Sequence, residues 1–393
     1  MQKKRNILGN KIVTIAALAL VVFGSLMVAS AEMGNSVGDT DYLTGVIIKQ
    51  VIFAVIGIGA YFFTMHFQSF LVKTYEISIK VYYVLYVILA FVLMSCRVFG
   101  QINGAYAWIS LGSFGTIQPS EFAKVFMIIF GARLLGENHK ERNFNNFVIF
   151  AGATLIYCFI IFVIQKDLGS AVVLFAICYC ILMVPPYKEI QQYQKYMSLG
   201  VILAVGLIVL AISPIGTKLV TSIDGGYMLG RFQAAANPFL YRYDNGYHVI
   251  MSLVSFASGG ILGAGYGNSV HKYMNFPNPS NDFILPVIVE ELGIIGFGGF
   301  VIAYGCILIP LIRASIKSKY ISSKMILLGV FVYFIVHFIL NVGGVSALIP
   351  LTGVPILLIS SGGSSLLASM IGLGFAQAEL IRNKAVDNEG NSR

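Results

Sequence analysis

The residue with the clearest chemical meaning is Asp282, a carboxylate that stands where a long polar stretch meets a strongly apolar run, in FPNPSNDFILPVIVEELGIIG. An ionisable group at the start of a membrane span is costly unless water, a partner or a substrate compensates it, so a functional role is the default interpretation. A partly desolvated carboxylate has a raised pKa and can act as a general base. Helix capping is the alternative, because Asn281 or Asp282 could N-cap the span that follows.

The stretch before Asp282 also carries cations. Arginine can bind the oxygens of a phosphate in bidentate fashion, and lysine acts as a point charge, so these residues could bind an anion. Within this stretch, residues 246–267 are too apolar for a solvated loop and predict a short helix followed by a glycine-rich turn at the membrane edge, beside a cavity. The other charged residues of the stretch are Lys218, Arg231, Arg242, Lys272, Asp224 and Asp244.

The elements that position these residues are membrane spans. The 393 residues are 57% hydrophobic and only 11% charged, which indicates an all-α polytopic membrane protein with a single membrane domain, residues 1–393. A helix needs about 20 apolar residues to cross a hydrocarbon core about 30 Å thick, and ten segments qualify. The predicted spans are 12–31, 45–64, 80–96, 119–136, 146–164, 168–186, 197–214, 283–312, 323–349 and 354–381.

The basic residues orient these spans, because lysine and arginine concentrate in cytoplasmic segments. With the N-terminus inside, 18 of the 26 lysines and arginines fall on the cytoplasmic side, including those of the tail, 383–393. Topology therefore accounts for the net charge of +9 without nucleic acid. The one long outer connection is 215–282, and long connections in compact proteins usually carry function. The five cysteines lie in or beside spans and are interpreted as packing residues.

Other polar residues also fall within spans or at their outer ends. Glu121 and Lys124 stand three apart on one predicted helix, and form either a structural ion pair or contacts to a substrate. Glu290 and Glu291 are adjacent, so they point about 100 degrees apart; we expect one to pack in the bundle and the other to reach the cavity. Trp108, the only tryptophan, is an interface anchor or a recognition residue.

Five motifs in order resemble one family. They are NGAYAWI (103–109), QPSEFAK (118–124), QKDLGSA (165–171), NDFILPVIVEELGIIG (281–296) and NVGGVSALIPLTGVPILLISSGGSS (341–365). Together they are similar to the SEDS proteins, for shape, elongation, division and sporulation, the group that contains FtsW, RodA and SpoVE. The similarity covers most of the chain, and the GYH segment at 246–248 favours the FtsW and SpoVE side.

The resemblance implies a ten-span enzyme of the bacterial cytoplasmic membrane, at the division septum for a division member. Such an enzyme polymerises lipid II, the undecaprenyl-diphosphate-linked disaccharide pentapeptide, into the β-1,4 glycan strands of peptidoglycan. Its implied partners are a class B penicillin-binding protein, as transpeptidase, and other membrane proteins of the divisome or elongasome.

Carried over residue by residue, the resemblance places the family's essential aspartate on Asp282, which would take the proton of the attacking 4-hydroxyl. Arg231, with Lys272 or Lys218, would face the departing diphosphate. Further substrate contacts are expected at Trp108, Glu121 and Lys124. Ser364 belongs to a glycine- and serine-rich run, 360–365, that is either a close-packing element or a phosphate cradle. A divalent cation, Mg²⁺ or Mn²⁺, could share the work, although the sequence has no dedicated cage for one.

The chain departs from the family pattern beside its central residue. Where the family has PExHTD, this sequence has PNPSND, so Asn278, Ser280 and Asn281 replace Glu, His and Thr. Ala107 replaces the arginine before the tryptophan, and His248 replaces a glutamine and is interpreted as an interfacial histidine. Two other classes stay open: a lipid II flippase or transporter, which ten spans and an outer cavity could serve, and a noncatalytic scaffold for the penicillin-binding protein, which fits the altered PNPS segment. A transporter would need polar groups through both leaflets, and the cytoplasmic halves of the spans carry few.

Overall fold

The computed structural model is a bundle of long helices. It describes residues 9–37, 39–71, 78–102, 104–112, 115–136, 143–212, 230–231, 235, 237–243, 245–274, 276 and 278–390. The long helices are α1 (Lys11–Glu32), α2 (Thr40–Leu71), α3 (Ile79–Ser95), α4 (Pro119–Leu135), α5 (Asn143–Phe159), α6 (Leu168–Leu182), α7 (Lys188–Ile212), α10 (Asn245–Gly259), α11 (Ile284–Lys317), α12 (Ile321–Val345) and α13 (Gly363–Gly390). Short elements are η1 (Cys96–Phe99), η3 (Ile160–Ile164), η4 (His271–Tyr273), and the antiparallel pair β1 (Ile109–Ser110) and β2 (Thr116–Ile117).

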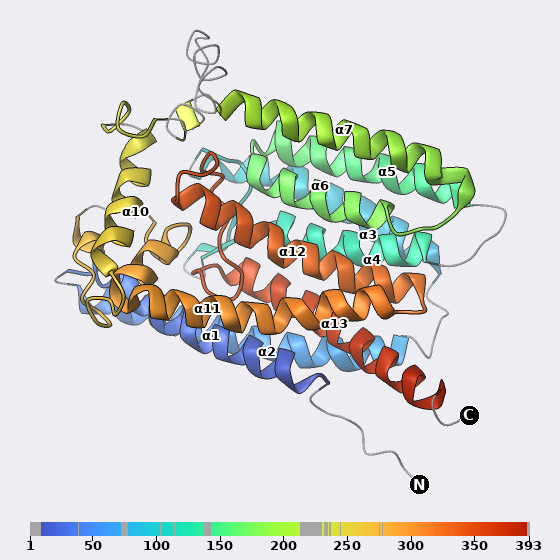
Figure 1. Cartoon of the computed structure of the whole chain (residues 1–393), viewed down its shortest axis with the longest axis horizontal. Helices are drawn as coiled ribbons and strands as arrows, with labels where there is room; N and C mark the ends of the chain where they lie inside the picture. The colour runs from blue at the N-terminus through green and yellow to red at the C-terminus, as the bar shows by residue number, and fades with distance from the viewer. Residues whose placement is uncertain are drawn as a thin grey trace.

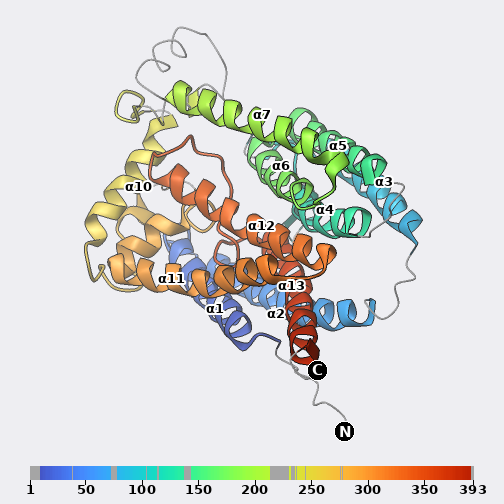
Figure 2. The same cartoon turned by 45° about the vertical axis from the view of Figure 1, so that its right-hand side comes forward.

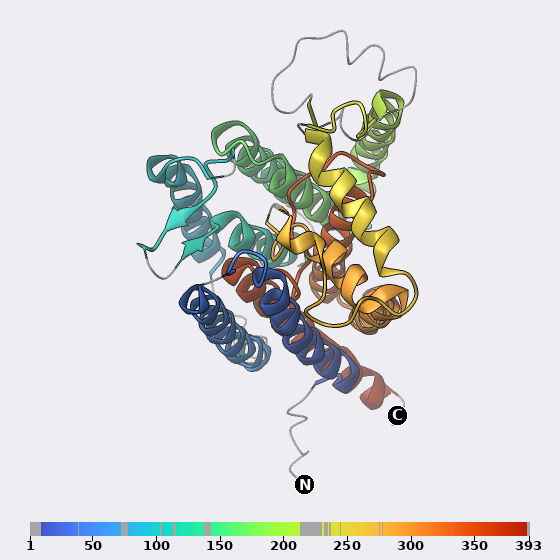
Figure 3. The same cartoon turned by 90° about the vertical axis from the view of Figure 1, so that its left-hand side faces the viewer.

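Among the described residues, seven helices are long and apolar enough to cross a membrane, and α6 is a shorter apolar helix. The chain is therefore a multi-pass membrane protein, as its composition predicts. Most helices run along the long axis of the molecule, whereas α10 stands across one end of it (Figure 1). The view along that axis shows α10 beside the end of α11 (Figure 3), with which it is in contact. The helix and glycine-rich turn predicted at 246–267 are confirmed as α10 and the turn after it.

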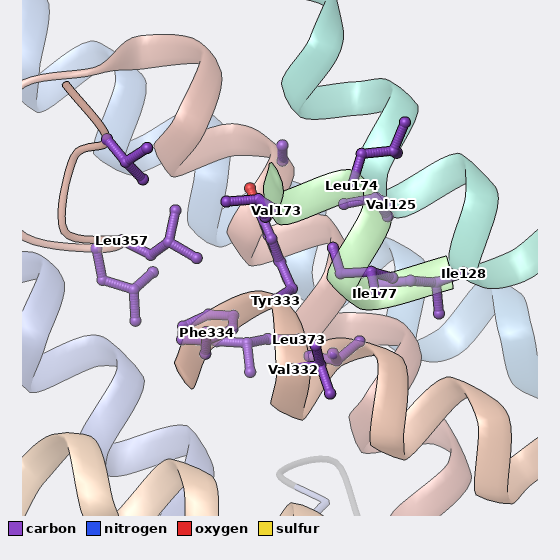
Figure 4. Packing of buried hydrophobic residues seen from close by; sticks show 14 of the residues in the cluster. Val125, Ile128, Val173, Leu174, Ile177, Val332, Tyr333, Phe334, Leu357 and Leu373 are labelled. Atoms are coloured by element: carbon purple, nitrogen blue, oxygen red, sulfur yellow. The ribbon is translucent and has the colours of Figure 1, made fainter. Parts of the chain in front are cut away.

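The centre of the bundle is α12, which contacts α4 and α6 on one side and α11 and α13 on the other (Figure 2). Its residues Tyr333 and Phe334 are fully buried. Branched aliphatic side chains of the neighbouring helices fill the space around these rings, and a core packed in this way holds its helices rigidly. Figure 4 labels Val125 and Ile128 from α4, Val173, Leu174 and Ile177 from α6, Val332 from α12, Leu357, and Leu373 from α13.

Helix α11 breaks at Gly293, whose backbone has φ 66° and ψ −168°. The break frees polar groups that the turn after α10 satisfies. The amides of Ala264 and Gly265 donate to the carbonyl oxygens of Glu290 and Glu291, both at 2.9 Å, and the amide of Ile294 donates to Gly260 at 3.0 Å. Irregular backbone at this depth is tolerated because protein groups pair with it.

The last helix begins later than predicted, so the predicted span 354–381 is wrong at its start. Residues 346–362, which we call the inner segment, are non-helical, although Ile356 and Leu357 are almost completely buried. Pro350 and Pro355 lack the amide that a helix needs, and Gly353 has φ +70°, outside the right-handed helical region. Apolar composition predicts burial of this segment correctly, but not its conformation.

Candidate active site

Asp282 lies in the turn before α11 and is half-buried. It does not cap that helix: the N-cap position is Phe283, and no side chain makes a capping hydrogen bond there. The capping alternative is therefore wrong. The ring of Phe283 packs edge-on against Phe276, with centroids 5.3 Å apart, and lies 6.0 Å from the ring of His248. Aromatic packing, and not a cap, fixes the entry into α11, and it leaves the carboxylate of Asp282 available for other contacts.

The surroundings of Asp282 alter its basicity. Burial raises its pKa to about 6, the positive charge of Arg231 opposes that rise, and the negative charge of Asp167 adds to it. The carboxyl oxygen Oδ2 of Asp282 lies 3.4 Å from the position that a Cβ would take on Gly353, so carboxylate and inner segment are in close approach. A carboxylate with a pKa near 6 is mostly ionised at neutral pH and is a stronger base than an exposed aspartate.

Arg231 reaches the inner segment as well. Its Nη1 donates to the carbonyl oxygen of Leu351 at 3.0 Å. The guanidinium group thus lies at the same short stretch, Leu351–Gly353, that approaches Asp282, in agreement with its electrostatic effect on that carboxylate. The structure therefore brings together two of the residues singled out in the sequence.

Asp167 is a residue of this site that the sequence analysis did not assign to it. It N-caps α6, where its Oδ1 accepts from the amide of Ser170 at 2.9 Å and its Oδ2 accepts from Nε2 of Gln118 at 2.8 Å. Gly169 packs against the inner segment, since a Cβ there would lie 2.6 Å from Val354 Cγ2. The motif QKDLGSA contains the signal, because it places a second carboxylate at the start of an apolar span.

Lys272 has a different environment from the one that a phosphate contact would need. Its Nζ is buried and donates to three protein oxygens: Glu291 Oε1 at 2.8 Å, the Gly267 carbonyl at 2.8 Å and Ser30 Oγ at 3.0 Å. An ammonium group has three hydrogens to donate, so all of them are used. The role of Lys272 in binding the substrate stays a prediction, and its three hydrogen bonds within the protein do not support it. Lys218 lies outside the described residues.

Glu290 and Glu291 both contact the segment that contains Lys272. This differs from the expectation that one of them would reach the cavity. Glu290 accepts from Ser269 Oγ at 2.7 Å and from His271 Nδ1 at 2.8 Å, while Glu291 binds Lys272 and accepts from Ser30 Oγ. Their different directions agree with adjacent helix positions. Among the described residues, no group of three or more histidine, cysteine, aspartate or glutamate side chains is arranged to hold a metal ion.

Glu121 and Lys124 form a buried ion pair, with Lys124 Nζ 2.6 Å from Glu121 Oε1. Tyr333 donates to Glu121 Oε2 at 2.7 Å, and His337 Nε2 lies 3.4 Å from Lys124 Nζ. Both side chains are at most 1% exposed, which favours the structural alternative. Their direct contact with a substrate stays a prediction.

Trp108 and Ser364 also stay predictions as substrate contacts. Trp108 is half-buried and directly precedes β1. Ser364 is buried in the first turn of α13, beside Gly363, where a Cβ would lie 2.5 Å from the ring of Phe53. This close approach favours the interpretation of the glycine- and serine-rich run as a packing element.

The fold and this site define a class: a multi-pass helical membrane protein with an arginine and a carboxylate of raised pKa at one end of the bundle. The model of the cell cycle protein family that contains FtsW, RodA and SpoVE matches residues 10–381, so the chain belongs to this family. The resemblance drawn from the five motifs is confirmed.

Individual relatives agree with this assignment. The chain is 29% identical over 367 residues to stage V sporulation protein E of Bacillus subtilis (strain 168), covering 92% of this chain and 94% of that protein. It is 30% identical over 365 residues to the probable peptidoglycan glycosyltransferase FtsW of the same organism, covering 91% and 87%.

Solved structures share the fold. A chain of a peptidoglycan synthase complex superposes with a TM-score of 0.68 at 22% identity, covering 95% of this chain and 97% of that one. The rod shape determining protein RodA of Thermus thermophilus superposes with a TM-score of 0.60 at 23% identity, covering 94% and 96%.

Proposed function

We propose that the protein is a peptidoglycan glycosyltransferase that polymerises lipid II into β-1,4 glycan strands, with Asp282 as general base. The observation that carries this proposal is the half-buried carboxylate of raised pKa beside Arg231, at the end of the bundle where α11 begins. Family membership and relatives named peptidoglycan glycosyltransferase support it.

The reaction assigns a step to each group. The 4-hydroxyl oxygen of one disaccharide attacks the anomeric carbon of another, its proton passes to the Asp282 carboxylate, and the bond between that carbon and the diphosphate oxygen breaks. The bonding electrons leave with the lipid diphosphate, whose charge the guanidinium of Arg231 can stabilise. Asp167 makes Asp282 the stronger base by raising its pKa. General base catalysis of this kind contributes about 10² to 10⁴ in rate.

For the membrane arrangement we propose ten spans, the seven long apolar helices together with α4, α6 and α7. Both termini would then lie in the cytoplasm of a bacterial cell, below its cytoplasmic membrane, and the site would face outward. The start of α1 lies beside the second half of α13, where the Asn10 amide donates to Gln377 Oε1 at 2.9 Å, as both termini on one side require.

A class B penicillin-binding protein is the proposed partner, since polymerised strands must be crosslinked and the related fold occurs within a peptidoglycan synthase complex. A divalent cation is a further proposal: Asp282 and Asp167 supply two carboxylates near the place where a diphosphate would leave, and Mg²⁺ or Mn²⁺ prefers such oxygen ligands.

The test is lipid II polymerisation by the purified protein with its cognate penicillin-binding protein, whose own glycan synthesis is excluded. Asp282→Asn should reduce strand formation by at least about 10²-fold, because the shape is kept and the base is lost. Asp39→Asn is the matched control: Asp39 accepts from the Tyr42 amide at 2.9 Å, and asparagine serves equally well in that position. Strands formed equally by wild type and Asp282→Asn would contradict the mechanism, and no strands from wild type would favour the flippase or the scaffold.

A further inference from the structure

One face of α12 carries polar side chains at every fourth residue: Tyr333, His337 and Asn341. Residues four apart lie on the same side of a helix, and His337 and Asn341 on this side contact the inner segment. We propose that Asn341 is a positioning residue that holds Asp282 and the Arg231 contact in a fixed relation. The inference rests on the proposed function and concerns the same site.

The backbone before α11 is held through three consecutive carbonyl groups. The Ser280 carbonyl accepts from the Ser361 amide at 2.7 Å, the Asn281 carbonyl accepts from Ser360 Oγ at 2.8 Å, and the Asp282 carbonyl accepts from Asn341 Nδ2 at 2.8 Å. The donors come from the inner segment and from α12. Such a row of contacts fixes the main chain of the base residue, in place of the helix cap that it lacks.

Asn341 contacts both Asp282 and the inner segment. Its Nδ2 donates both to the Asp282 carbonyl and to the Val354 carbonyl, each at 2.8 Å, and the residue is only 3% exposed. Three residues before Val354, the Leu351 carbonyl accepts from Arg231. The buried amide group of Asn341 therefore connects the backbone of Asp282 to the inner segment, which binds Arg231.

His337, one helical turn before Asn341 on the same face, also contacts the inner segment. His337 Nδ1 lies 2.9 Å from the Pro355 carbonyl, which can only accept, so Nδ1 carries the hydrogen and Nε2 is left to accept from Lys124. Lys124 is in turn paired with Glu121, which also accepts from Tyr333. The QPSEFAK motif thereby supports the inner segment through His337, which is a reason for its charges that needs no substrate.

Loss of the Asn341 amide should displace the base rather than abolish the fold. Asn341→Leu keeps the volume and removes both donors, so the Asp282 and Val354 carbonyls lose their partner. A displacement of about 1 Å from productive geometry can cost about 10²-fold in rate. We expect kcat to fall about 10- to 100-fold while KM for lipid II changes much less, because the two groups that Asn341 positions, Asp282 and the Arg231 contact, act on charge that develops in the transition state.

The matched control is Gln377→Leu. Gln377 is a fully buried amide that binds Asn10 and Thr14, at the opposite end of α1 from the site. A second pair compares Ser360→Ala, which removes the donor to Asn281, with Ser369→Ala, which removes a buried hydroxyl that donates to the carbonyl of Leu366 within α13. If Asn341→Leu lowers kcat no more than Gln377→Leu does, the inference is overturned.

Hydrogen exchange in lipid nanodiscs provides a readout that does not depend on activity. Asn341→Leu should speed amide exchange in peptides covering 278–283 and 351–361, whereas Gln377→Leu should leave both unchanged. Unchanged exchange in Asn341→Leu would overturn the inference even if the wild type proved inactive. A wild type without polymerase activity, with faster exchange in Asn341→Leu alone, would instead reject the proposed function and retain the positioning role of Asn341.

Discussion

Replacing Lys272 distinguishes a structural lysine from a phosphate contact. Lys272 Nζ lies 2.8 Å from Glu291 Oε1, and both side chains are 0% exposed. Lys272→Met fills the same space with an uncharged chain, but it leaves the Glu291 carboxylate buried, with Ser30 Oγ and the Ser269 amide as its remaining donors. A buried charge that has lost its counterion is the expensive part of this change.

The expected cost is about 3 to 5 kcal/mol, because breaking one partner of a buried pair strands the other charge. The two remaining hydrogen bonds to Glu291 place the value near the lower end. The double variant Lys272→Met/Glu291→Leu removes both charges and should regain most of that loss, since an apolar replacement of a whole buried pair is often neutral. The structural interpretation therefore predicts strong coupling: the double variant should lose much less stability than the sum of the losses in the two single variants.

The assay is thermal unfolding of the purified protein in detergent, followed by polymerisation of lipid II. Lys319→Met, at an exposed lysine, serves as the control and should change stability by less than about 0.5 kcal/mol. Unchanged stability in Lys272→Met, together with lost polymerisation that Glu291→Leu does not restore, would refute the structural reasoning and return Lys272 to the substrate site.

Two further predictions concern the base and the broken helix. The acid limb of the rate against pH should lie near the pKa of Asp282, about 6, with activity falling as pH drops below it, because only the ionised carboxylate accepts a proton. Asp167→Asn should move this limb to lower pH, measured as the midpoint of kcat against pH, since the raising charge is lost; an unmoved limb would mean that Asp167 does not influence the base. Gly293→Ala should lower the unfolding temperature markedly, because its Cβ would lie 2.3 Å from the Ile261 carbonyl oxygen and its φ is +66°. Gly298→Ala is the control and should leave the unfolding temperature unchanged, because a Cβ there would have nothing within 4 Å. Equal effects of the two substitutions would contradict the account of the break in α11.

The contacts of a site residue could be predicted only where its partners lie near it in the sequence. Asp282 was found from its residue type and its place before an apolar run, whereas Arg231 was singled out among the cations of the loop by the family resemblance. The structure brings both to the inner segment. Lys272 looked like a free outer cation because its partner, Glu291, is 19 residues away. The two meet because α11 breaks at Gly293 and receives the turn after α10, a tertiary event that hydropathy does not report.

The late start of α13 has a different cause. Hydropathy marks 354–381 as one apolar run, and apolarity alone does not separate a helix from a buried irregular segment. Pro350 and Gly353 precede the predicted span and Pro355 lies in its first turn, where proline is tolerated, so these residues mark a turn before 354 but not the actual start of α13 at Gly363. Asp167 was missed for a related reason, since its effect on Asp282 depends on the inner segment lying between α6 and α11.

The residues that depart from the family pattern before Asp282 make contacts of their own. Ser280, where the family has histidine, donates to Glu32 at the end of α1, and Glu32 also accepts from Tyr42 at 3.1 Å. Asn278 adopts φ +44°, which asparagine tolerates better than most residues. The loop is thus bound both to α1 and, through the Ser280 carbonyl, to the inner segment, which holds the backbone before Asp282. Glutamate and histidine at 278 and 280 would therefore add the family's side chains but would also remove the bond to Glu32 and strain the backbone at 278, so we expect the double replacement alone to lower stability, measured as the unfolding temperature.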